Sequence, residues 1–149
     1  MEKFNIMQFA DTKVNNKGMQ REWALCKYYG IERTRHDNVA YDEGSDIELA
    51  EHGISVKSAK ATLMCGSKCR GCHTFEGIWR RYRRRVHSDQ FAYVTSDFEV
   101  FMMSLDEFSK FVHKFATLSR ESTRNGGDIK IQFLSESKKM REWLEMRVA

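Results

Sequence analysis

The sequence predicts an α/β (α+β) domain in which a mixed sheet is flanked by helices. Segments with apolar residues at helical spacing alternate along the chain with short segments rich in β-branched and aromatic residues. Proline is absent from the whole sequence, which is typical of regular elements joined by short turns. A chain of 149 residues can bury one good core, so we expect a single domain over residues 1–149.

The first predicted elements are a helix and a short strand. The helix runs from about Gly18 to Tyr29 and stops at Gly30, the usual residue type for a C-terminal cap. A polar, turn-rich segment follows, with a short strand near residues 38–41. The residues expected on the inner face of the helix are Met19, Trp23, Cys26 and Tyr29.

A β-hairpin is the next predicted element. Residues 46–49 and 54–62 each alternate charged or polar residues with aliphatic ones, and a tight polar turn at 50–53 separates them. This alternation predicts that each strand has one polar face and one apolar face.

The expected register of the hairpin brings charged side chains together. Because side chains alternate across a strand, Asp46 and Glu48 share one face. On the facing strand Ser55 and Lys57 lie opposite them, roughly 5 Å away. Two carboxylates at that separation can share a hard divalent cation such as Mg²⁺, and an adjacent ammonium can stabilise charge at a phosphoryl group. The alternative is a solvent-exposed face whose cross-strand charges contribute little.

The middle of the chain predicts a helix and two strands. Apolar residues recur at helical spacing over residues 75–87, with arginines on the other faces. Residues 91–95 and 98–104 are rich in aromatic and aliphatic residues and are separated by a Ser-Asp turn.

Three elements complete the chain. A helix at 105–115 is predicted by its apolar spacing and by Ser104 and Glu107, which have the spacing of a capping box. Residues 129–134 alternate as a strand does, and an amphipathic helix capped by Ser135 closes the sequence.

Positive charge is concentrated in one segment. The chain has a formal net charge of only +4, yet residues 79–87 hold five arginines in nine positions. Guanidinium groups bind phosphates in a bidentate manner and displace condensed counterions, so this helix predicts contact with nucleic acid; the alternative is a solvated face. The residues expected to contact nucleic acid are Arg80, Arg81, Arg83, Arg84, Arg85 and Lys60.

A cysteine-rich segment, CGSKCRGCH at 65–73, admits several interpretations. Its spacing is that of c-type haem attachment, of the cluster motif in radical S-adenosylmethionine enzymes, and of a compact zinc or iron–sulfur site. Haem attachment needs export and the radical enzymes need a larger barrel, so a loop with free thiols is favoured, with structural zinc as the retained metal alternative. The zinc ligands would be Cys65, Cys69, Cys72 and His73.

The sequence predicts a cytoplasmic protein without a membrane partner. No run approaches the roughly 18 apolar residues that span a bilayer, and the N-terminal segment lacks the uninterrupted apolar stretch of a signal peptide. Three of the four cysteines lie within eight residues, which is not the dispersed pattern of a disulfide-bonded secreted domain.

The order of elements around the hairpin resembles the PD-(D/E)XK nuclease superfamily, which has the restriction-endonuclease-like fold. A helix carrying Glu22, a strand opening on Asp46 and a strand ending in Val-Lys at Lys57 carry the resemblance. It implies an αβββαβ core at about 18–95, with residues 96–149 as a C-terminal extension of strand and helices. It also implies that Asp46 binds Mg²⁺ or Mn²⁺, that Lys57 is catalytic, and that Glu22 matches a glutamate often found on the first helix.

Two positions depart from the pattern of this family. Ser45 stands where proline usually precedes the aspartate, and Ser55 stands where an acidic residue usually comes two positions before the lysine. Some restriction enzymes are similar in having Ser-Val-Lys there with a substitute glutamate on the next helix, which here would be Glu76. Glu48 is the nearer substitute. If neither serves, the resemblance implies a site that does not cleave.

The sequence therefore predicts a Mg²⁺-dependent endonuclease that hydrolyses phosphodiester bonds in DNA. Asp46 with Glu48 or Glu76 would ligate the metal, and Lys57 would position the attacking water and stabilise the phosphorus centre. One alternative is a nucleic-acid-binding or inhibitory protein that keeps the fold without the chemistry. Another is a protein-interaction module whose cysteine-rich loop is stabilised by a structural zinc ion. Many such nucleases act as dimers, so a homodimer is one expectation.

Overall fold

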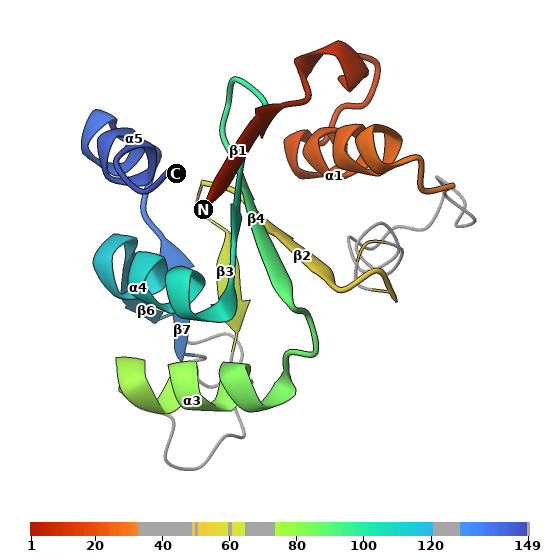
Figure 1. The fold of residues 1–149 in the computed structure, drawn as a ribbon. Coiled ribbons are helices and arrows are strands. Elements are labelled where there is room, and N and C mark those ends of the chain that lie inside the picture. The colour runs from red at the N-terminus through yellow and green to blue at the C-terminus, as the bar shows by residue number, and fades with distance from the viewer. Residues whose placement is uncertain (33–48, 50, 60, 65–73, 121–128, 149) are drawn as a thin grey trace.

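The computed structural model describes residues 1–32, 49, 51–59, 61–64, 74–120 and 129–148, and these residues form a mixed α/β arrangement (Figure 1). The strands are β1 (Glu2–Asn5), β2 (Ile54–Lys57), β3 (Thr62–Met64), β4 (Gln90–Val94), β5 (Glu99–Met103), β6 (Ala116–Arg120) and β7 (Ile129–Phe133). The helices are the short 3₁₀ helix η1 (Met7–Phe9), α1 (Lys17–Tyr29), α3 (Phe75–Arg85), α4 (Leu105–Phe115) and α5 (Lys138–Glu145).

The larger sheet is mixed, as predicted. Its strand order is β1-β5-β4-β2, with β2 parallel to β4 and the other two pairs antiparallel. The β4–β5 pair is the two-strand unit predicted around the Ser-Asp turn. A second sheet, β3-β7-β6, is antiparallel throughout.

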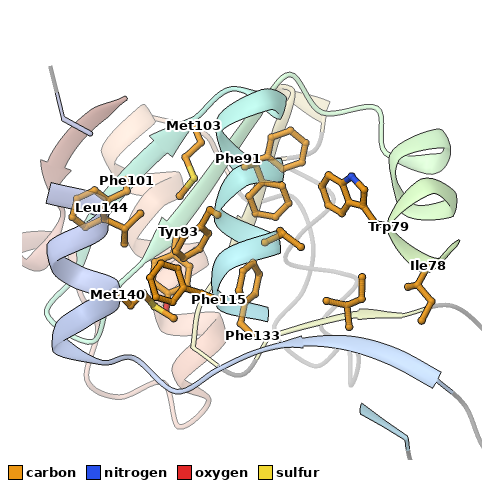
Figure 2. Close-up of a cluster of buried hydrophobic side chains, with 14 of the residues drawn as sticks. Ile78, Trp79, Phe91, Tyr93, Phe101, Met103, Phe115, Phe133, Met140 and Leu144 are labelled. Carbon is orange, nitrogen blue, oxygen red and sulfur yellow. The ribbon is translucent and has the colours of Figure 1, made fainter. Parts of the chain in front are cut away.

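Two clusters of buried side chains lie on opposite faces of the larger sheet. On one face, Leu25 and Cys26 of α1 pack with Val56 of β2 and Val94 of β4. On the other face, the side chains of β4 and β5 pack with α3, α4, α5 and the second sheet (Figure 2). Figure 1 shows α1 on one side of this sheet and α4 and α5 on the other.

The predicted ends of two helices are confirmed. The Asn16 side chain accepts a hydrogen bond from the Met19 amide at 3.1 Å, and α1 ends at Gly30, whose φ of 67° is in the left-handed region that favours glycine. In α4, Ser104 and Glu107 exchange both bonds of a capping box, at 2.9 and 3.2 Å. The expected inner face of α1 is wrong at Tyr29, whose side chain is 39% exposed.

The predicted hairpin is wrong where the structure describes it. Leu49, expected in its first strand, is helical and fully buried, and its carbonyl accepts a bond from the His52 amide at 3.0 Å. The predicted strand at 54–62 is divided, because β2 ends at Lys57 and β3 belongs to the second sheet. Alternation identifies a strand with two unlike faces, but it does not identify the partner, which for β2 is β4.

Other differences are smaller. The cap of α5 is Ser137, which accepts from the Met140 amide at 3.1 Å, and Ser135 lies before the helix. The strands β1 and β6 were not expected, and the strand predicted near 38–41 lies outside the described residues. Within the described part of the chain, no helix combines the length and apolar character that crossing a bilayer requires.

Candidate functional site

Lys57 lies at the C-terminal end of β2, on the face of the sheet opposite α1. In the parallel register Lys57 is beside Tyr93, and Val56 is beside Ala92. Val56 and Ala92 belong to the cluster under α1, and Tyr93 belongs to the other cluster. Because side chains alternate, Lys57 and Ser55 share the face of Tyr93, and both are at least partly buried.

The hydroxyl of Tyr93 is buried beside charged groups. Tyr93 is fully buried, and within the described residues its oxygen has no hydrogen-bond partner. Burial raises the pKa of the Tyr93 phenol, and the nearby Glu136 carboxylate raises it further, while Arg21 of α1 acts in the opposite direction. Charged side chains from α1 and from the β7–α5 connection therefore lie near the same end of β4 as Lys57.

Replacing Tyr93 with phenylalanine is expected to stabilise the protein by about 1 kcal/mol, since it removes a buried hydroxyl without a partner and keeps the ring contacts. The gain should grow at high pH. The unfolded phenol has a pKa near ~10 and the folded one a higher pKa, so the unfolded state loses its proton first and wild-type stability falls above about pH 10. Urea unfolding of both proteins at neutral pH and above pH 10 measures this difference. A substantial loss of stability at neutral pH would show that the hydroxyl has a partner.

The two glutamates predicted for the site lie in different surroundings. Glu22 is on α1, partly buried, with one carboxylate oxygen out of contact with solvent. Glu76 lies in the first turn of α3, and its Oε1 is 2.6 Å from Nε2 of His113 on α4. The structure therefore places Glu76 in a side-chain contact between α3 and α4. Sequence reasoning missed this contact because 37 positions separate the two residues.

The remaining candidate residues, which are six possible metal ligands and the predicted nucleic-acid contact Lys60, lie outside the described residues. They are Asp46, Glu48, Lys60, Cys65, Cys69, Cys72 and His73. Within the part of the chain that the structure describes, no three His, Cys, Asp or Glu side chains come together as a group that could hold a metal ion. The magnesium, manganese and zinc sites thus stay predictions.

The helix α3 is amphipathic, as predicted, and one side of it is basic. Ile78 and Trp79 are buried in the core, whereas Arg80 and three further arginines are exposed. Among the described residues, none of these four guanidinium groups makes an ion pair. We call the four residues the α3 arginine face: Arg80, Arg83, Arg84 and Arg85. Arg81 is partly buried and is not part of it.

The C-terminal position of these arginines is itself favourable. Arg83, Arg84 and Arg85 occupy the last turn of α3, where cations interact favourably with the helix dipole. The N-terminal end holds Glu76 in the first turn and Thr74 as the cap, with the Thr74 hydroxyl accepting from the Gly77 amide at 3.1 Å. The helix can therefore present concentrated positive charge without losing its local stability.

Lys57 and the α3 arginine face lie toward opposite ends of β4. The helix joins β4 at its N-terminal residue, Gln90, through residues 86–89, and Gln90 pairs with Ile54 at the start of β2. Lys57 pairs three residues further along, which corresponds to about 10 Å of strand. The arginine face therefore lies near the start of the β2–β4 pair, and Lys57 lies near its end.

Comparison of the chain with protein-family models, with curated proteins and with solved structures finds no match.

Proposed function

We propose that the protein binds nucleic acid through the α3 arginine face. The observation that carries this proposal is a helix held in the core by Ile78 and Trp79 whose other side exposes four arginines without ion pairs among the described residues. Exposed guanidinium groups held on a rigid helix suit a row of phosphates, because binding releases condensed counterions. Contacts between guanidinium groups and phosphates are made to the backbone of the nucleic acid and not to its bases, so we expect binding with little sequence preference.

The test is a titration of a labelled 20-base-pair DNA duplex with the purified protein, read by fluorescence anisotropy. We expect binding at about 50 mM salt that weakens steeply as salt is added, because each phosphate contact contributes about 0.9 to the slope of log K against log salt. A parallel titration with single-stranded DNA and with RNA identifies the preferred class. Absence of binding to all three at low salt would contradict the proposal.

Mg²⁺-dependent hydrolysis of DNA is a second candidate function. Its site would lie at the end of the parallel β2–β4 pair that holds Lys57, away from the end that α3 joins. The observation that favours it is the position of Lys57 at the carboxyl end of β2, since ligands of open sheets bind at the carboxyl ends of parallel strands. Glu22 lies on α1, on the other side of the sheet from Lys57, so the acidic ligands in this proposal are Asp46 and Glu48. Bound Mg²⁺ would supply a charge that polarises the phosphoryl group and activates water.

In this second proposal the residues of the chain have limited and specific roles. The Lys57 ammonium would hold a phosphate oxygen and stabilise the charge that develops on it. Asp46, with Glu48, would complete the oxygen ligands that Mg²⁺ requires. The separation of about 10 Å along β4 between the two ends implies that the arginine face would hold a part of the nucleic acid distant from the cleaved bond.

Replacing Lys57 with alanine is expected to lower the rate of Mg²⁺-dependent cleavage about a hundredfold, because one charge-stabilising group at the phosphoryl centre is lost. Plasmid DNA incubated with protein and Mg²⁺, with an EDTA control, measures the rate. Lys139→Ala on α5 is the matched control and should cleave as the wild type does. Equal cleavage by wild type and Lys57→Ala would reject the catalytic role. Binding of DNA without any cleavage by the wild type would favour the non-cleaving alternative.

A further inference from the structure

The helices α3 and α4 are packed side by side and joined through His113. Its Nε2 lies 2.6 Å from Oε1 of Glu76, and its ring is 5.6 Å from the ring of Trp79 in an edge-on arrangement. Phe108, five residues earlier on α4, contacts Trp79 and Tyr82 with ring centroids 6.1 and 6.4 Å apart. In Figure 1, α3 lies below α4. Their exposed faces therefore adjoin.

The exposed side of α4 also carries unpaired cations. Lys110 and Lys114 are exposed, and neither makes an ion pair among the described residues. They lie on α4 close to His113, which is the residue that contacts α3. On α3, Arg80 is one turn from Glu76 and so lies on the same stripe as the contact with His113. Asp106, one turn before Lys110, marks the acidic end of α4.

The carboxylate at the junction of the two helices is paired. His113 Nδ1 is 2.7 Å from the Ser109 carbonyl oxygen, and its Nε2 faces the Glu76 carboxylate. Both partners are acceptor oxygens, so the imidazole ring lies between two acceptors. The contact turns the Glu76 carboxylate toward α4.

We infer that the nucleic-acid surface extends across this junction onto α4, with Lys110 and Lys114 as further phosphate contacts. This inference rests on the proposed binding through the α3 arginine face and enlarges it. The partner is the phosphate backbone of the nucleic acid, because the exposed arginines and lysines of the two helices outnumber their exposed carboxylates, which are Glu76 and Asp106. Of the aromatic residues at the junction, Trp79 and Phe108 are buried and unable to stack on bases, whereas Phe75 and Tyr82 are partly buried.

The test compares Lys110→Gln/Lys114→Gln with the wild type and with Lys138→Gln/Lys139→Gln, which removes two exposed lysines from α5. Titration of the same DNA duplex over a salt series should show the α4 variant binding about tenfold more weakly, with a slope smaller in magnitude by about 1.8. The α5 variant should bind as the wild type does. If wild type binds and the α4 variant is indistinguishable from it, the inference is overturned while the proposed function stands. If wild type does not bind, both fail.

A second comparison tests the contact between Glu76 and His113. His113→Gln removes the imidazole that turns the Glu76 carboxylate toward α4, so the carboxylate is free to repel a phosphate and binding should weaken about threefold. Adding Glu76→Gln removes that charge and should restore wild-type affinity, and thermal unfolding of each variant confirms that it is folded. Failure of the double variant to recover would overturn the role given to this pair in the surface.

Discussion

Replacing Phe111 with alanine is expected to lower the free energy of unfolding by about 3–5 kcal/mol. Phe111 is fully buried on α4, and its ring lies 4.9 Å from that of Tyr93 on β4 and 5.2 Å from that of Phe133 on β7. It also lies 5.8 Å from the ring of Trp143 on α5. One side chain thus packs against both sheets and the last helix, and its loss leaves a cavity that no single neighbour can fill.

Urea unfolding followed by circular dichroism measures this change. Met146→Ala is the matched control, because that side chain is 82% exposed and its truncation should change stability by less than about 0.5 kcal/mol. A loss of under about 1 kcal/mol for Phe111→Ala would mean that the two sheets and α5 do not share one core. The loss of most of the folding free energy would agree with the packing described here.

Replacing all four residues of the α3 arginine face with glutamine is expected to weaken binding to a DNA duplex about a thousandfold at low salt. The estimate takes roughly 1 kcal/mol for each lost phosphate contact. The four residues are Arg80, Arg83, Arg84 and Arg85. All are exposed, so their replacement should leave the core contacts of Ile78 and Trp79 intact.

The matched control replaces the same four arginines with lysine. Lysine keeps the charge but loses the planar fork of donors, so this variant should retain most of the affinity and nearly all of the salt dependence. Fluorescence anisotropy at several salt concentrations measures both quantities. Equal binding by the glutamine variant and the wild type would place the nucleic-acid surface elsewhere or remove it altogether.

Local signals predicted the helices and their ends well. Gly30 and the Ser104–Glu107 capping box act through residues within one turn, so their role is visible in the sequence. Two serines two positions apart precede α5, and the sequence favoured Ser135 where the structure uses Ser137. Either serine hydroxyl can accept a hydrogen bond from a backbone amide, and sequence spacing alone does not decide between the two.

Long-range pairing was the main source of error. The alternation at 54–57 identified β2, but its partner lies in β4, more than thirty positions later in the sequence. Leu49 continues an alternating pattern and is nevertheless helical, because a buried aliphatic residue suits either structure. The short strands β1 and β6 carry weak patterns and are stabilised by pairing with β5 and β7.

The candidate site was predicted in part. The amphipathic character of α3 and the exposure of its arginines followed from helical spacing, which fixes which residues share a face. The contact between Glu76 and His113 did not, because it depends on how two helices pack. The position of Lys57 relative to α3 also required the topology of the sheet.

The slope of log K against log salt for the wild type and for the glutamine variant of the α3 arginine face tests the central claim most directly. We predict a slope of about −3.6 or steeper for the wild type on duplex DNA, and a slope smaller in magnitude by about 3.6 for the variant. Two slopes that agree within error, or a wild type that does not bind at about 50 mM salt, would contradict the assignment of this face to nucleic acid.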